Sequence, residues 1–251
     1  MLQEALGAFA QADWSLALVY ARVQAFFLVL PGFGERILPV RLRVSFAIVL
    51  TPFLAGFTIP RAIPDAPLAL LSGPGAEMVI GFMAGGLLRI LVMALDVATT
   101  AIAATASLSQ IMGIQNEASP HPVGNMLHLG GLALLMALGF PVMLVQLLAD
   151  SLLIWPPGSM PDAGYILDNG VRIVASSFWL AMMLAAPFTL GGFLYQALSG
   201  IINRVMPALP VVFIGAPGSI LLALIALCVL APLLVSIWAA QVLDFQLELP
   251  R

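Results

Sequence analysis

Four charged side chains lie inside long apolar stretches of the sequence and are the first candidates for chemistry. They are Arg22, Arg89, Asp96 and Asp150. Placing an arginine or an aspartate at the centre of a bilayer costs about 2.5–3.5 kcal/mol on insertion scales. Each of these groups is therefore expected to face protein, water or another charge rather than lipid.

Arg89 and Asp96 have a spacing that is informative in a helix. Seven positions are two helical turns, so both side chains lie on one face without touching directly. We expect them to pair with other segments or subunits, as buried charges in a helical bundle do. A proton relay through these two groups is the functional alternative.

The two histidines of the chain, His121 and His128, lie in the segment "HPVGNMLH". Glu117 is the nearest acid and the only obvious third ligand, so the sequence predicts no metal site here. Cys228, the single cysteine, is interpreted as a small buried hydrophobe.

Motifs of the common enzyme classes are missing from the sequence. It contains no HExxH, GxSxG, Walker A or GxGxxG pattern, so we expect neither catalysis nor a cofactor. An Asp96–Asp150 dyad of the membrane aspartic-protease type is a distant alternative, because nothing near either residue looks like a catalytic turn.

The composition indicates what surrounds these residues. Of 251 residues, 62% are hydrophobic and 8% are charged, whereas a soluble domain has about 25% charged residues. The chain is therefore expected to be a membrane protein. All nine basic residues are arginines and the net charge is −3, so there is no basic face for nucleic acid.

Six apolar runs are long enough, or nearly so, to cross a bilayer, which takes about 20 residues. They are Trp14–Leu30, Leu42–Ile59, Met78–Ala106, Met126–Trp155, Val171–Leu198 and Val211–Val242. Prolines interrupt the last three runs, so these helices are kinked or are pairs of shorter helices. The predicted fold is an all-α membrane protein of about six long, kinked or paired hydrophobic helices.

Two further patterns bear on packing and orientation. Gly81 and Gly85 form a GxxxG pattern, which lets helix backbones approach closely. The first connector carries Arg36, Arg41 and Arg43, and the positive-inside rule then places this connector in the cytoplasm.

Broken helices and intramembrane charges also suit a small-solute secondary transporter, whose binding site lies near the bilayer midplane. In this alternative Arg89 and Asp96 couple transport to an ion.

Three blocks of the sequence, in order, resemble the flagellar biosynthesis protein FliR family. Phe26–Leu54 is similar to its first helical hairpin, with the "iP.R.R" turn at Pro39, Arg41 and Arg43. Gly75–Pro122 is similar to the next block, which starts "E..iG...G" and leads through a small-residue helix into a loop with Gln and Gly.

The third block, Ser199–Pro217, resembles the family segment "NR..Pq.nvf..g.P". The matching residues are Asn203, Arg204, Pro207, Phe213, Gly215 and Pro217. Ala208 stands where the family usually has Gln, and Pro210 where Asn is common. Injectisome homologues share much of the pattern, and flagellar secretion is favoured over virulence secretion.

The resemblance implies a non-enzymatic subunit of the type III export gate in the bacterial inner membrane, at the flagellar basal body. FliP-like and FliQ-like sister subunits, an FlhB-like switch protein and membrane lipid are the implied partners, and unfolded proteins are the export substrates. Residues 1–251 form a single gate domain, packed with the sisters into a helical hetero-oligomer. About 1–125 is FliP-like and about 126–251 is FliQ-like.

The resemblance also assigns residues to roles. The plug loop that closes the pore is carried over to Gln110, Ile111, Met112, Gly113, Ile114 and Gln115, with Met112 and Ile114 as stoppers. Structural and assembly roles fall to Arg22, Arg36, Pro39, Arg41, Arg89, Asp96, Asn203, Arg204, Pro207, Phe213 and Pro217. Ser199–Pro217 is expected to be a turn in which Arg204 reaches carboxylates or helix C-terminal carbonyls. A plain cytoplasmic loop is the alternative.

Overall fold

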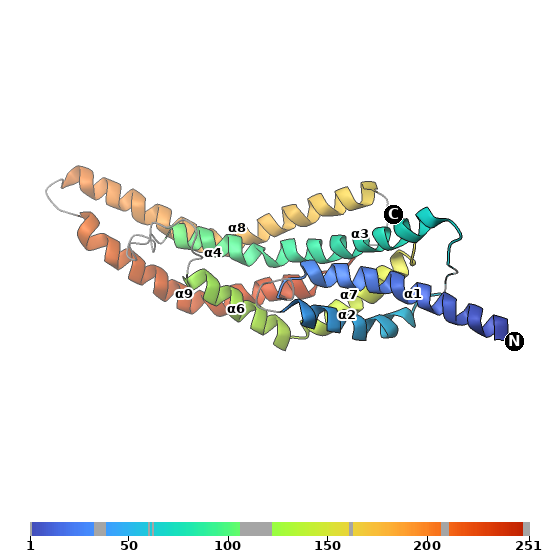
Figure 1. The fold of residues 1–251 in the computed structure, drawn as a ribbon. Coiled ribbons are helices and arrows are strands. Elements are labelled where there is room, and N and C mark those ends of the chain that lie inside the picture. Colours follow the sequence, from blue (N-terminus) through green and yellow to red (C-terminus); the bar gives the residue numbers. More distant parts are fainter. Residues whose placement is uncertain are drawn as a thin grey trace. The chain divides into compact units, whose positions relative to one another are not determined.

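The computed structural model describes residues 2–32, 39–59, 61, 63–105, 122–160, 163–206 and 211–247. These residues are mostly helical and include no strand. The helices, shown in Figure 1, are α1 (Leu2–Val29), α2 (Val40–Ala55), α3 (Pro67–Val92), α4 (Ala94–Thr105), α6 (Pro122–Ala137), α7 (Phe140–Ile154), α8 (Ala163–Val205) and α9 (Val211–Leu243). The chain is an all-α membrane protein, as its composition predicts.

The six apolar runs are found as helices, and two of them as pairs. The third run divides into α3 and α4 at Met93, and the fourth into α6 and α7. By length and composition, three segments of the described chain can cross a membrane: Leu70–Ala103, Ala163–Val205 and Pro217–Leu243. The pair α6 and α7 adds a fourth if it forms one broken span.

The break between α6 and α7 has an identifiable cause. Leu138 and Gly139 separate the two helices, and Gly139 has φ +98. Glycine adopts this left-handed conformation without a steric penalty, and Pro141 lies in the first turn of α7, where its missing N–H costs no helical hydrogen bond. By contrast, α8 continues through Pro187, and α9 through Pro217 and Pro232.

The chain divides into two compact units, each built from separate stretches of sequence. Unit 1 comprises residues 1–91, 139–174 and 244–251, and unit 2 comprises 92–138 and 175–243. The division near residue 125 suggested by the family resemblance concerns likeness to two sister proteins, and it remains a prediction.

In unit 1, α3 packs against α1 through the predicted glycine pair. A Cβ atom on Gly81 would lie 2.3 Å from the carbonyl oxygen of Arg22, and one on Gly85 would lie 2.9 Å from that of Phe26. Only glycine allows the backbones this close, and the flanking core residues Leu18 and Leu88 are buried. The prediction that this GxxxG pattern marks a tight helix contact is confirmed.

In the described part of unit 2, Trp238 of α9 is the largest fully buried side chain. Its indole Nε1–H donates a hydrogen bond of 3.1 Å to the carbonyl oxygen of Val92. Gly131 of α6 faces its ring, because a Cβ atom there would lie 2.9 Å from Trp238 Cζ3. A large ring opposite a glycine brings α6 and α9 together, while the hydrogen bond satisfies the buried indole.

Candidate functional site

The strongest polar site in the described chain is a buried ion pair in unit 1. Arg22 of α1 donates from Nε to Oε2 of Glu77 on α3, at 2.6 Å. Both side chains have an exposed fraction of 0%. Arg22 was expected to face protein rather than lipid, and it does so.

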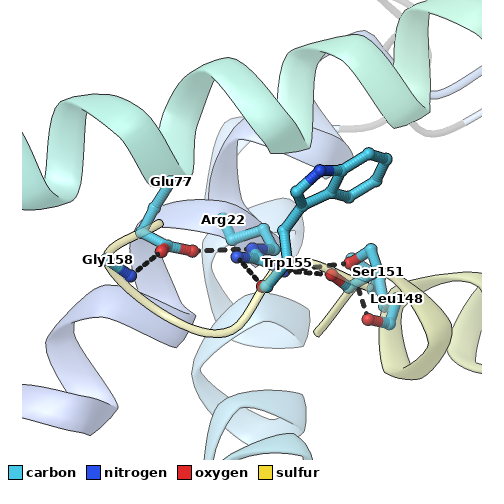
Figure 2. A network of polar contacts seen from close by, with 6 residues as sticks. All are labelled: Arg22, Glu77, Leu148, Ser151, Trp155 and Gly158. Carbon is cyan, nitrogen blue, oxygen red and sulfur yellow. Dashed lines mark hydrogen bonds and ion pairs between the residues drawn. The ribbon is translucent and has the colours of Figure 1, made fainter. Parts of the chain in front are cut away.

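The Arg22 guanidinium also holds the C-terminal end of α7, as Figure 2 shows. Nη1 donates to the carbonyl oxygen of Ser151 at 2.6 Å, and Nη2 donates to that of Trp155 at 2.8 Å. The last carbonyls of a helix lack partners within it and carry partial negative charge, so a cation is favourable there. One side chain thus joins α1, α3 and α7.

The second oxygen of Glu77 is used as well. Oε1 accepts a hydrogen bond of 2.6 Å from the backbone N–H of Gly158, in the turn that follows α7. Gly158 has φ +79, a left-handed conformation that other residues adopt only with strain. The carboxylate therefore fixes both the guanidinium and this turn (Figure 2).

The arrangement is suited to holding helices and offers little for catalysis. Nε, Nη1 and Nη2 of Arg22 all have acceptors, and both oxygens of Glu77 have donors. The hydroxyl of Ser151 donates to the carbonyl oxygen of Leu148 in its own helix, at 2.7 Å. Removing one partner of such a buried pair typically costs about 3–5 kcal/mol, because the other charge is left uncompensated.

Sequence reasoning placed Arg22 among the structural residues but did not find its partner. The third apolar run begins at Met78, so Glu77 lies one position outside it. The available signal was the "E" of the family-like "E..iG...G" start, which lies one helical turn before Gly81. Gly81 is the residue that brings α3 against the backbone of Arg22.

Arg89 makes a contact of the same kind within unit 1. Its Nη1 donates to the carbonyl oxygen of Val29, the last residue of α1, at 3.1 Å. Its expected pairing with another segment is therefore present, although the partner is a backbone carbonyl instead of a carboxylate. Arg22 and Arg89 both bind the carbonyl ends of helices.

Asp96 pairs with a histidine in unit 2. His128 Nδ1 of α6 lies 2.8 Å from Asp96 Oδ1 of α4, and the exposed fractions of the two side chains are 18% and 38%. In the part of the chain that the structure describes, no three His, Cys, Asp or Glu residues gather as a metal site would require. The side chains of His121 and Glu117 lie outside the described residues.

Most of the remaining residues singled out from the sequence lie near helix ends or outside the described chain, but Cys228, expected to be buried, is exposed in the middle of α9. Pro39 precedes α2 and Arg41 lies in its first turn, both exposed. Asn203 and Arg204 are exposed near the end of α8, and Pro217 is exposed in α9. Outside the described residues are Arg36, Pro207, the side chain of Phe213, and Gln110, Ile111, Met112, Gly113, Ile114 and Gln115.

The turn expected over Ser199–Pro217 is shorter than predicted. Helix α8 continues to Val205 and α9 begins at Val211, so most of this stretch is helical. Arg204 lies in the last turn of α8, where its charge is favourable beside the helix C-terminus.

Three apolar segments of membrane-crossing length, one of which is joined to α1 through Arg22 and Arg89, define the class of this molecule as an all-α membrane protein. The chain matches the family described as bacterial export proteins, family 1, over residues 14–245, and it belongs to that family. It is 30% identical to the flagellar biosynthetic protein FliR of Caulobacter vibrioides, over 88% of this chain and 90% of the relative. It is also 25% identical to the flagellar biosynthetic protein FliR of Aquifex aeolicus, over 92% of this chain and 90% of that relative.

Proposed function

We propose that this chain is a non-enzymatic subunit of the flagellar type III protein export gate. It forms, with FliP-like and FliQ-like sister subunits, the channel that passes unfolded substrates across the bacterial inner membrane at the flagellar basal body. The observation that carries the proposal is the match to the export-protein family over residues 14–245, together with two FliR relatives that align along nearly their whole length.

The exposed apolar faces of the helices support an assembled state. Only 17% of the apolar window in Pro217–Leu243 is buried, and 33% of that in Ala163–Val205. Large exposed side chains on α2, α8 and α9 include Phe46, Val49, Phe53, Phe178, Trp179, Phe193, Leu222 and Val229. Apolar surface of this extent is covered in a membrane complex by lipid or by neighbouring helices. In the proposed gate the sister subunits cover part of it.

The buried clamp of Arg22 and Glu77 gives unit 1 a fixed arrangement against which sisters pack. Because the clamp joins three helices, a partner that binds one of them meets a surface already positioned. An FlhB-like switch protein completes the proposed set of partners. The FliP-like character of residues 1–125 and the FliQ-like character of 126–251 belong to the same proposal.

The small-solute carrier is less well supported. That alternative needs Arg89 and Asp96 as coupling groups, yet Arg89 is hydrogen-bonded to a backbone carbonyl and Asp96 is paired with His128. The family match to export proteins gives this alternative no support.

Complementation of a strain lacking this chain tests the proposal. A tagged copy should restore swimming and should be extracted in mild detergent as part of a large complex with stoichiometric sister subunits. A carrier, in contrast, would be stable alone or as a small homo-oligomer and would bind a solute saturably. Normal swimming of the strain that lacks the chain, or recovery of the tagged chain as a well-behaved monomer, would refute the gate function.

The plug loop is tested separately. A flexible apolar constriction can stop ions while it admits a polypeptide, and Met112 and Ile114 are the proposed stoppers. Deleting Ile111–Gln115 should make cells leak small solutes while the complex still assembles. Unchanged membrane permeability in cells with an intact complex would contradict a plug at this position.

A further inference from the structure

A cavity of about 220 Å³ opens in unit 1 near the buried ion pair. Neither Arg22 nor Glu77 lines this cavity. Its lining comes from α1, the connector between α2 and α3, the first turns of α3, and the turn after α7. The lining includes Trp14, Arg61, Ser72, Gly158 and Met160. Gly158 is the residue whose N–H binds Glu77, so the cavity lies directly next to the clamp.

Arg61 is the one charged residue among those that line the cavity, all of which are described. Its backbone N–H donates to the hydroxyl of Ser15 at 2.9 Å, which ties the connector to α1. Its guanidinium lies beside the turn after α7, since a Cβ atom on Gly158 would be 2.8 Å from Arg61 Nη1. The backbone of Arg61 is therefore tied to α1, and its guanidinium lies beside the turn after α7 at the cavity.

The guanidinium of Arg61 differs from those of Arg22 and Arg89. Those two donate to a carboxylate or to backbone carbonyls. For Arg61, no side-chain hydrogen bond or ion pair occurs within the described part of the chain. A guanidinium has five donors and no acceptor, and its planar fork matches the oxygens of a phosphate or a carboxylate. The cavity is therefore suited to an anion.

The surroundings of the cavity indicate which anion. Four large apolar residues lie within a few positions of the lining residues in the sequence, and their side chains are exposed: Ile59, Ile63, Leu68 and Leu71. The α3 wall of the cavity lies at the start of the apolar segment Leu70–Ala103, which is long enough to cross a membrane. The ends of such segments meet lipid headgroups, and tryptophan and arginine are favourable at that depth.

We propose that this cavity binds the phosphate group of an anionic membrane phospholipid. The Arg61 guanidinium donates to the phosphate oxygens, and the exposed apolar side chains beside the cavity contact the glycerol and the first acyl carbons. This binding site is additional to the proposed export function and does not depend on it.

The assembled membrane complex, purified in a neutral detergent, provides the test. Phosphatidylglycerol is titrated into mixed micelles, and the lipid bound per complex is counted by native mass spectrometry. Arg61→Gln should weaken binding of one phosphatidylglycerol about tenfold, as expected for the loss of a charge-assisted hydrogen bond. Arg61→Lys, which keeps the charge, should lose much less.

A matched control and a second variant complete the design. Arg172→Gln removes the same charge from α8, where the side chain donates to Asn169 and lies outside the lining, so lipid binding should be unchanged. Met160→Glu adds a carboxylate at an exposed lining position, where it should compete with the phosphate group for Arg61 and repel it, and so weaken binding while the arginine is kept. If the complex with Arg61→Gln fails to assemble, lipid binding by the Met160→Glu complex tests the proposed site instead.

Two further titrations separate the sources of phosphate. Phosphatidylcholine should bind far more weakly than phosphatidylglycerol, and equal binding would overturn the preference for an anionic lipid. Inorganic phosphate alone should not displace phosphatidylglycerol, and displacement at millimolar concentration would assign the site to free phosphate instead. Equal phosphatidylglycerol binding by wild type, Arg61→Gln and Met160→Glu would show that the proposed lipid site does not exist. Complex assembly and swimming would still support the proposed gate function in that case.

Discussion

Replacing Arg22 with methionine and Glu77 with leucine, singly and together, tests whether their ion pair holds unit 1 together. Each single variant leaves one fully buried charge without its partner, and the expected cost is about 3–5 kcal/mol of unfolding free energy. The double variant removes both charges and replaces them with side chains of comparable size. It should therefore be more stable than the sum of the single effects predicts.

The hydrogen bonds around the pair limit this recovery. The carbonyl oxygen of Ser151 still accepts from the N–H of Trp155 when Arg22 is absent, so it stays satisfied. The carbonyl of Trp155 loses the donor Arg22 Nη2, and the N–H of Gly158 loses the acceptor Glu77 Oε1; each group left unpaired costs about 1–3 kcal/mol. With single effects of about 4 kcal/mol each and a double-variant loss of about 4 kcal/mol, the coupling energy between the two residues should be about 4 kcal/mol.

The assay is protease resistance of the membrane-extracted chain across a series of increasing concentrations of denaturing detergent. Arg172→Met is the control, because this exposed arginine donates to Asn169 one helical turn away and its loss should cost less than about 1 kcal/mol. Additive effects of the two single substitutions, or single effects as small as the control, would refute the clamp.

Three further predictions concern packing in each unit. Gly81→Ala should destabilise the chain strongly because its Cβ atom would clash with a carbonyl of α1, whereas Gly75→Ala, with open space around it, should be neutral or stabilising by up to about 1 kcal/mol; thermal melts of the extracted protein compare them. A double-mutant cycle on Asp96 and His128 should give a coupling energy below about 1 kcal/mol, since both side chains are partly exposed to solvent. A larger coupling energy would contradict this solvent exposure. Trp238→Phe should cost about 1–3 kcal/mol, because it removes the buried indole donor, and a melt unchanged from wild type would contradict that.

Local patterns in the sequence predicted the features that depend on local geometry. The spacing of Gly81 and Gly85 fixes both on one face of a helix, and that face does approach a neighbouring backbone. Pro141, with Gly139 before it, does mark a break. Proline alone is a weaker signal, because α8 and α9 continue through Pro187 and Pro217.

The partner of each buried charge could not be predicted in the same way. Arg22 and Glu77 are separated by 55 positions, and which residues meet depends on how two helices cross, which composition and periodicity leave open. Backbone acceptors are harder still, because the carbonyl of Val29 that binds Arg89 leaves no trace in the residue type. The residues of the plug loop lie outside the described chain, and their role stays a prediction.

Arg22 binds α7 through main-chain oxygens, and this affects which amino-acid substitutions unit 1 can tolerate. Main-chain oxygens exist at every position whatever amino acid is encoded, so Ser151 and Trp155 can be replaced without abolishing the acceptors that Nη1 and Nη2 reach. Only the two charged side chains and the small residue at Gly158 are chemically demanding. When a helix is bound through its backbone carbonyl groups, its side chains can change during evolution while the contact is retained.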